Sequence, residues 1–183
     1  MKTLIKRNMG KLLLALAALS LTGCLKNGYE GLKNSSDKAL TAVNYTYRFL
    51  YNDTIQKGTP QQEIQLDRVC EVVFSKTTTA IEVNGMKGFS TTIKHSLSSV
   101  MKAGPTGSVT TQQLYNEFVK RIQTEQLSNL WVYVTISDVA KLTPQGKAPQ
   151  LGKPGDFTQD QVYRVTAADG TYQDYVLRTV KGF

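Results

Sequence analysis

Val43-Asn-Tyr-Thr-Tyr-Arg-Phe-Leu-Tyr51 is the stretch that decides the fold, because every second residue in it is aromatic or β-branched. Successive side chains of a strand point to opposite faces, so this period predicts a half-buried strand. Tyr45, Tyr47 and Tyr51 are also candidates for ligand binding, since flat aromatic rings can stack on sugar rings. A core face has the same pattern, and we favour the core for these tyrosines.

Turn residues divide the remaining sequence into further short strands. Residue pairs that favour turns occur at Asn84-Gly85, within Gly104–Gly107 and at Asp169-Gly170. Apolar or alternating runs around these turns predict strands over 64–74, 80–83, 89–97, 130–136, 162–168 and 171–180. Many short strands without a regular alternation of strand and helix predict a mainly β chain folded as a mostly antiparallel β-sandwich.

Residues 130–136 give the strongest strand signal. Trp131 and Tyr133 share one face and aliphatic residues the other, so both faces are apolar. This pattern predicts a central strand that is covered on both sides. Residues 143–155 contain three of the five prolines and predict an ordered loop that crosses between sheets, followed by Phe157 at the edge of the core.

One short helix is expected near residues 110–126. Apolar residues recur at helical spacing from Leu114 to Ile122. Thr110 and Gln113 have the spacing of a capping box, which marks the start of a helix. A strand with a polar interruption is the alternative.

Residues 1–23 have the form of a bacterial secretion signal, with a basic start, an apolar run from Leu12 to Leu21 and small residues at the end. An apolar run of this length is too short to span a bilayer. Leu21-Thr-Gly-Cys24 resembles a lipobox, which implies that Cys24 is acylated and becomes the first residue of the mature chain. Residues 24–38 would then form a flexible tether. An ordinary cleaved signal followed by a chance cysteine is the alternative.

The predicted signal changes the charge assigned to the folded chain. The full chain has 22 Lys plus Arg and 14 Asp plus Glu, and four of the basic residues lie in the signal, so the mature chain has a net charge of only +4. Nucleic-acid binding needs clustered basic residues and is not expected. Leu25-Lys-Asn27 lacks the Asp that commonly retains lipoproteins in the inner membrane. We therefore expect the outer membrane, with its periplasmic face slightly favoured over the cell surface.

Few side chains are suited to catalysis or metal binding. With Cys24 assigned to the lipid, Cys70 has no disulfide partner and is expected to be a buried free thiol in an apolar strand. His95 is the only histidine, which excludes a histidine-rich metal site. No catalytic motif appears, so we expect no enzyme, no metal and no cofactor. Four acids match no calcium-loop spacing: Asp156, Asp160, Asp169 and Asp174.

The C-terminal sequence contains a series of motifs. They are Leu130-Trp-Val-Tyr-Val134, Ala140-Lys-Leu-Thr-Pro144, Gly152-Lys-Pro-Gly-Asp-Phe157, Tyr163-Arg-Val-Thr-Ala-Ala-Asp-Gly170 and Tyr175-Val-Leu177. In this order they resemble a repeated module of Bacteroides-type outer-membrane lipoproteins. Those modules are similar to immunoglobulin-like β-sandwiches, and the resemblance implies no catalytic residues.

The resemblance covers roughly residues 128–180 and suggests how the chain is divided. We expect a strand-rich region with one helix over 39–127 and an immunoglobulin-like module over 128–183. Whether these regions form one sandwich or two domains is left open by the sequence.

Three functions fit these observations. The leading hypothesis is a lipid-anchored, non-catalytic envelope protein that serves as a binding or spacer module of an outer-membrane assembly that handles glycans. Its partners would be the membrane, through the Cys24 lipid, and a glycan or an envelope protein. One alternative is an adhesin or fimbria-like subunit that assembles by strand exchange. The other is a hydrolase whose site the sequence hides.

The last hairpin allows a prediction of register. A three-residue loop over 168–170 sets Tyr163 opposite Tyr175, which keeps the apolar residues of both strands on one face. A two-residue loop would set Tyr163 opposite Val176 and turn the side chains of one strand over. We therefore predict the three-residue loop, with a bulge and positive φ at Gly170.

Overall fold

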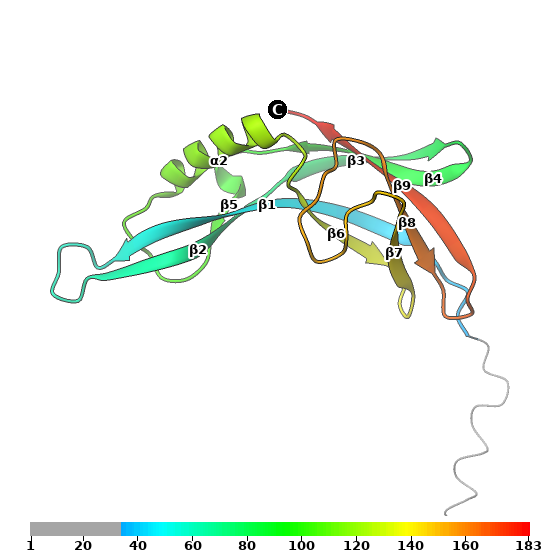
Figure 1. The fold of residues 1–183 in the computed structure, drawn as a ribbon, viewed down its shortest axis with the longest axis horizontal. Coiled ribbons are helices and arrows are strands. Elements are labelled where there is room, and N and C mark those ends of the chain that lie inside the picture. The colour runs from blue at the N-terminus through cyan, green and yellow to red at the C-terminus, as the bar shows by residue number, and fades with distance from the viewer. Residues whose placement is uncertain (1–33) are drawn as a thin grey trace, which may run out of the picture. The chain divides into compact units, whose positions relative to one another are not determined.

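The computed structural model describes residues 34–183, and Ser35–Phe183 forms one compact unit (Figure 1). This unit has two sheets, nine strands and one α-helix, which confirms the prediction of a mainly β sandwich with one helix. None of the helices in the described part is long and apolar enough to cross a membrane. The predicted signal peptide and Cys24 lie outside the described residues.

The first sheet, sheet A, has the strand order β5-β2-β1-β6 and is antiparallel throughout. The long strand β1 runs through its middle, and its predicted core face is confirmed because Val43, Tyr45 and Tyr47 are each 1% exposed. The strands of sheet A are β1 (Leu40–Ile55), β2 (Glu63–Val73), β5 (Val100–Lys102) and β6 (Trp131–Ile136).

The second sheet, sheet B, has the order β3-β4-β9-β8-β7. In agreement with the predicted mostly antiparallel sandwich, all pairs between strands of this sheet are antiparallel except β4 and β9, which are parallel. Their connection is a long crossover that contains the helix and β6, and a parallel pair requires such a crossover in place of a hairpin. The strands of sheet B are β3 (Ser75–Val83), β4 (Met86–Lys94), β7 (Lys141–Gln145), β8 (Gln161–Thr166) and β9 (Tyr172–Lys181).

The helix α2 (Thr111–Glu125) follows a short 3₁₀ turn, η1 (Leu97–Ser99). Its predicted capping box is present, since the Thr110 hydroxyl accepts a hydrogen bond from the backbone N–H of Gln113, and the Gln113 side chain accepts one from Thr110 N–H. The helix covers the middle of β1, where the rings of Tyr47 and Phe118 meet with centroids 5.4 Å apart.

Sheet B covers the first half of β1. The Tyr45 ring meets Phe157 edge to face at 5.9 Å, and the Thr179 hydroxyl of β9 donates to the Tyr45 oxygen at 2.9 Å. The predicted place of Phe157 in the core is therefore confirmed. A single core cluster joins both sheets and the helix.

Two details of the predicted strands are wrong. Strand β6 lies at the edge of sheet A and is only partly covered, whereas we predicted a central strand. The apolar side chains on its outer face line a cleft instead of a core. Pro144 lies inside β7 and not in a loop, which is possible because β7 is an edge strand whose outer side needs no N–H donor.

The predicted register of the last hairpin is confirmed. Tyr163 lies opposite Tyr175, and Gly170 has φ +86°. Gly170 N–H donates to Ala167 O at 3.0 Å, and Ala167 N–H donates to Thr171 O at 2.8 Å. These bonds define a three-residue loop in which the glycine occupies the bulge position.

Both sheets combine strands from the two regions that the sequence suggested. In sheet A, β6 pairs with β1, and in sheet B, β9 pairs with β4. Residues within the predicted tether also bond to the last hairpin, since Ser35 O accepts from Asp169 N–H at 3.1 Å and Lys38 O accepts from the Tyr175 hydroxyl at 3.1 Å. These bonds hold the segment directly before β1 against the last hairpin of sheet B.

Candidate functional site

The tyrosines that were candidates for ligand binding do not form an exposed platform. Tyr45 and Tyr47 lie in the core, where burial raises the pKa of both hydroxyls, that of Tyr45 to about 12. Tyr51 lies further along the same face, below the guanidinium of Arg68. The buried rings of Tyr45 and Tyr47 cannot stack on a ligand from solvent, so the structure contradicts a binding role for these two tyrosines, whereas Tyr51 is only partly buried.

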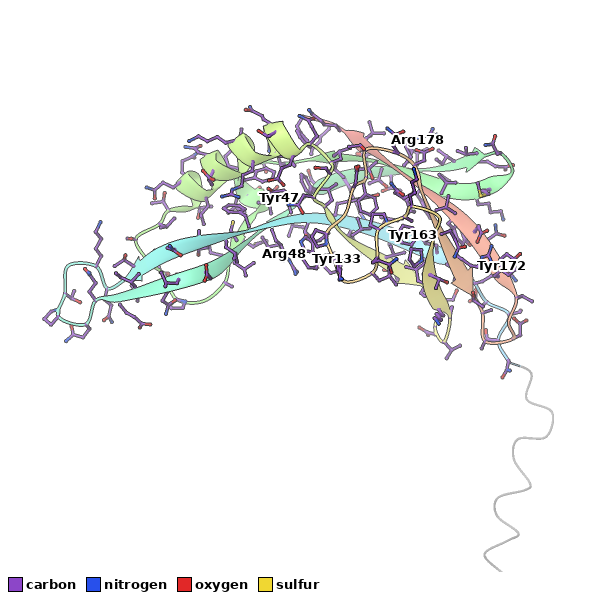
Figure 2. All side chains as sticks on the ribbon, in the orientation of Figure 1. Tyr47, Arg48, Tyr133, Tyr163, Tyr172 and Arg178 are labelled. Atoms are coloured by element: carbon purple, nitrogen blue, oxygen red, sulfur yellow. The ribbon has the colours of Figure 1, made fainter. Side chains whose placement is uncertain are left out.

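The exposed aromatic surface lies instead on the outer face of sheet A. Trp131 and Tyr133 project from β6, and Tyr133 is 43% exposed. Arg48 from the neighbouring strand β1 reaches over them, with its guanidinium carbon 4.8 Å from the centre of the Trp131 ring and 5.8 Å from that of Tyr133. Figure 2 shows Arg48 and Tyr133 together on sheet A, away from Tyr172 on sheet B.

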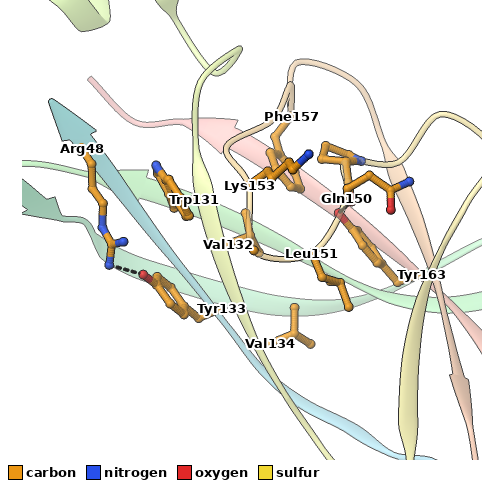
Figure 3. A pocket seen from close by; sticks show the side chains of 12 residues that line it. Arg48, Trp131, Val132, Tyr133, Val134, Gln150, Leu151, Lys153, Phe157 and Tyr163 are labelled. Atoms are coloured by element: carbon orange, nitrogen blue, oxygen red, sulfur yellow. Dashed lines mark hydrogen bonds between the residues drawn. The ribbon is translucent and has the colours of Figure 1, made fainter.

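A cleft of about 300 Å³ opens between β6 and the loop that connects β7 to β8; we call it the Trp131 cleft (Figure 3). Phe157 and Tyr163 form its inner wall, and the Tyr163 hydroxyl holds the loop by donating to Pro149 O at 2.9 Å. The lining residues come from both sheets and from the loop: Arg48, Trp131, Val132, Tyr133, Val134, Pro149, Gln150, Leu151, Gly152, Lys153, Phe157 and Tyr163.

The polar groups of the Trp131 cleft are mainly hydrogen-bond donors. Arg48 is fixed by Glu71, whose carboxylate oxygen lies 2.8 Å from the guanidinium Nε, and it also donates to the Tyr133 hydroxyl. The bond to Glu71 raises the pKa of Arg48, so this cation stays charged. The Lys153 ammonium and the Gln150 amide lie on the opposite side of the cleft (Figure 3).

A second cavity of about 370 Å³ adjoins the Trp131 cleft and shares Arg48 and Trp131 with it. Leu50, Val69 and Asn129 are among its other lining residues. Trp131 therefore contributes to two adjacent concave surfaces. An extended ligand could contact both of them through this one aromatic side chain.

The arrangement is suited to binding a polar ligand that has apolar faces. Aromatic rings provide flat contact area, and the arginine, lysine and glutamine provide directed hydrogen bonds. The residues that line the Trp131 cleft include no carboxylate, histidine, serine or cysteine. The cleft thus offers recognition groups and no pair of acids of the kind used for glycosidic cleavage.

The four C-terminal acids do not converge. Asp160 pairs with Arg178 at 2.6 Å and Asp174 with Arg164 at 2.7 Å, and these arginines lower the pKa of both carboxyls. Asp156 and Asp169 each accept hydrogen bonds from the threonine two residues later. Within residues 34–183 no cluster of three or more metal-binding side chains is present.

Cys70 and His95 lie in apolar surroundings. Cys70 is fully buried in β2, which confirms the sequence prediction, and burial raises the pKa of its thiol to about 11. His95 lies directly after β4, where its Nδ1 is 3.1 Å from the Tyr115 hydroxyl and its ring contacts Phe118. Burial lowers the pKa of His95, which favours a neutral packing role.

A buried ion pair was missed by the sequence analysis. Arg68 on β2 donates to Asp53 on β1 at 2.7 Å, and Asp53 also accepts from Val109 N–H at 2.9 Å. Arg68 donates further to Ala103 O and to Pro105 O. The pair therefore attaches the loop before α2 to the β1–β2 hairpin, which is a structural role.

Known proteins resemble the chain in two ways. Residues 102–178 match the model of a family described as DUF5018-related. The crystal structure of a Bacteroides fragilis protein described as a "putative secreted protein" is similar, at 25% sequence identity and a TM-score of 0.51. That similarity covers 81% of this chain and 98% of the other. A search among curated proteins found no match.

The comparisons bear on the resemblance drawn from the sequence motifs. The family match spans β6 to β9 and also includes α2, so it begins earlier than the predicted module. The structural neighbour comes from Bacteroides, the same type of bacterium that the motifs suggested. A relation to proteins of this bacterial type is thereby supported.

Proposed function

We propose that the chain is a lipid-anchored, non-catalytic protein of the outer membrane that binds a saccharide in the Trp131 cleft. In this role it is a binding module of an assembly that handles glycans. The observation that carries the proposal is the cleft itself, where Trp131, Tyr133 and Arg48 form an exposed aromatic and cationic surface opposite Lys153. Sugar rings have apolar faces and polar edges, and this surface offers partners for both.

Hydrogen bonds hold both walls of the Trp131 cleft in place, and this supports a binding role. Arg48 is held by Glu71 and by the Tyr133 hydroxyl, and the opposite wall is held by the bond from Tyr163 to Pro149. The side chains that would contact a ligand are therefore oriented before it arrives. Such preorganisation lowers the entropic cost of binding.

The envelope location rests on two observations. Residues 1–24 have the form of a lipoprotein signal, and the similar Bacteroides fragilis protein is described in terms of secretion. The proposed location is the outer membrane, with its periplasmic face slightly favoured over the cell surface, because Leu25-Lys-Asn27 lacks the Asp that commonly retains lipoproteins in the inner membrane. The expected partners are the membrane and a saccharide chain.

A saccharide microarray tests the binding role. The detergent-solubilised full chain is applied to immobilised neutral and acidic polysaccharides, beside Trp131→Ala and Tyr172→Ala. Tyr172 is a matched control because it is also an exposed strand aromatic below an arginine, with Arg164 lying 3.8 Å over its ring on sheet B.

We expect the wild type and Tyr172→Ala to bind the same saccharides. Trp131→Ala should bind at least about 25-fold more weakly, since loss of a central tryptophan costs about 2 kcal/mol or more and each 1.4 kcal/mol is tenfold in affinity. Equal binding by Trp131→Ala would contradict the proposed site. Absence of binding to every saccharide would contradict the proposed ligand class.

A further inference from the structure

The four edge strands of the two sheets, β5 and β6 in sheet A and β3 and β7 in sheet B, differ in how readily they could pair with a further strand. Strand β5 has only three residues, β7 contains Pro144, and the loop that lines the Trp131 cleft lies beside β6. Strand β3 has nine residues, contains no proline and pairs with β4 without a register shift. Open edges of this length are templates for strand addition, which charges, prolines and bulges normally prevent.

The backbone groups on the free side of β3 can be identified from the hairpin that it forms with β4. A two-residue loop, Asn84-Gly85, closes this hairpin with φ values of +52° and +78°. Val83 and Met86, which flank such a loop, exchange their hydrogen bonds, and every second residue from there bonds β4. The residues between them direct their N–H and C=O groups to the free edge: Lys76, Thr78, Ala80 and Glu82.

We infer that two copies of the chain pair through antiparallel β3 strands centred on Thr79, which joins their B sheets. In this register Thr78 of each copy lies opposite Ala80 of the other, and both direct their backbone groups to the shared edge. Pairs of this type exchange two hydrogen bonds each. The inference is independent of the proposed saccharide site.

Charge selects this register among those that the backbone allows. With Thr79 at the centre, Lys76 of one copy lies opposite Glu82 of the other, and the symmetry repeats this pair. Opposite charges directly across two strands stabilise the pairing, and like charges oppose it. In the described part of the chain, Glu82 has no ion pair of its own. The Lys76 ammonium donates to Val43 O and, at 2.7 Å, to Asn44 Oδ1, which leaves one of its three donors for Glu82 of the other copy.

The partner is a second copy because the strand is complementary to itself. The central residues Thr77, Thr78 and Thr79 are uncharged and exposed, and the two charged residues of opposite sign lie at equal distances from Thr79. A symmetric dimer requires one surface to match itself in this way. A strand from an unrelated protein would need no such symmetry.

Disulfide cross-linking tests the register in the full chain. In the predicted dimer the two Thr79 residues oppose each other in a pair without backbone bonds, where the Cα atoms lie about 4.5 Å apart. This spacing suits a disulfide. Membranes that contain Thr79→Cys should give a dimer of twice the chain mass on a non-reducing gel after mild oxidation.

Three controls distinguish cross-links formed within the predicted β3–β3 pair from cross-links formed by random collision of two chains. Thr77→Cys should cross-link several-fold less, because its partner is Ile81, and the double variant Thr77→Cys/Ile81→Cys should cross-link like Thr79→Cys. Adding Ala80→Pro to Thr79→Cys should abolish the dimer. The Ala80 N–H points to the free edge, so proline there leaves the β3–β4 bonds intact, and circular dichroism verifies the fold.

The charge pair gives a second measurement. Glu82→Lys in the Thr79→Cys chain sets lysine against Lys76 of the other copy and should reduce cross-linking several-fold. Mixing this variant with Thr79→Cys/Lys76→Glu should restore it, because the two chains then carry matching charges. Equal cross-linking at residues 77 and 79, no dimer from Thr79→Cys, or a product with the mass of a different partner would each overturn the inference.

Discussion

Replacement of Asp53 by asparagine should destabilise the protein strongly. Asp53 is 2% exposed and Arg68 8% exposed, and their charged atoms are 2.7 Å apart. Asparagine keeps an oxygen that can accept the N–H groups of Val109 and Thr54, so the substitution removes mainly the charge. Breaking a buried pair by removing one partner costs about 3–5 kcal/mol, because the remaining charge stays buried without its counter-ion.

The surroundings of the pair explain why relaxation cannot recover this energy. Without the carboxylate, the Arg68 guanidinium keeps hydrogen bonds to Ala103 O and, at 2.8 Å, to Pro105 O, and it keeps its contact with the Tyr51 ring, but none of these groups carries a negative charge. Gly107 lies directly against the carboxylate, where an added Cβ would be 2.2 Å from it. The loop and the hairpin are in contact here, so solvent has little access to the guanidinium.

Urea unfolding measures the effect, with Glu117→Gln as the matched control. Glu117 pairs with Arg121 at 2.9 Å on the exposed surface of α2, and loss of such a pair costs about 0.3–0.5 kcal/mol. Asp53→Asn should lower the free energy of unfolding by several times that amount. A difference of less than about 0.5 kcal/mol between the two variants would refute the reasoning.

The same pair predicts a pH dependence. Burial alone would raise the pKa of Asp53, but hydrogen bonds from Val109 and Thr54 and the charge of Arg68 outweigh it and hold the pKa below the ordinary value of 3.8. The ionised carboxylate therefore stabilises the fold above that value, and the contribution is lost as the pH falls through the lowered pKa. The wild type should lose more stability on acidification below about pH 4 than Asp53→Asn does; equal losses would contradict the assignment.

Three further predictions concern single residues. Cells fed a radioactive fatty acid should label the wild type and not Cys24→Ala, and undiminished labelling of the variant would contradict the lipid anchor. The Cys70 thiol, whose pKa burial raises to about 11, should react slowly in the native protein and quickly after denaturation; stoichiometric labelling within seconds would contradict its burial. Gly170→Val should cost about 1–2 kcal/mol in urea unfolding, because φ is +86° there although open space surrounds the residue; an unchanged midpoint would show that the loop adapts.

The sequence predicted those structural elements that are determined by a pattern of a few neighbouring residues. The alternation in β1 identified both the strand and its core face, because burial of Tyr45 and Tyr47 depends on the period of two. The capping box located the start of α2. The Asp169-Gly170 turn, together with the need to keep apolar residues on one face, was sufficient for the register of the last hairpin.

Features that depend on contacts between distant residues could not be predicted in this way. Two apolar faces on β6 indicated a central strand, since a sequence cannot show that one face lines a cleft at a sheet edge. The parallel pairing of β4 with β9 depends on the path of the intervening chain. Arg68 and Asp53 appeared to be ordinary polar positions in strands, and only the loop packed over them makes the pair buried.

The candidate site shows the same division. The sequence showed that Trp131 and Tyr133 share one face of their strand. The alternating Tyr45, Tyr47 and Tyr51 on β1 fitted either a stacking surface or a core face, and the core was the favoured interpretation. Which face of which strand is covered is decided by α2 and sheet B, which bury Tyr45 and Tyr47 on β1 and leave Trp131 partly exposed and Tyr133 exposed on β6.

Tryptophan fluorescence tests the central claim most directly, because Trp131 is the only tryptophan in the chain and lies in the proposed site. The full chain is titrated with a saccharide that it retains on the microarray, while calorimetry measures binding independently. A saccharide that stacks at Trp131 should change the emission in a saturable way, with the same midpoint as the calorimetric curve, and Lys153→Ala should move both midpoints to higher concentration. Calorimetric binding without any change in Trp131 emission would contradict the site.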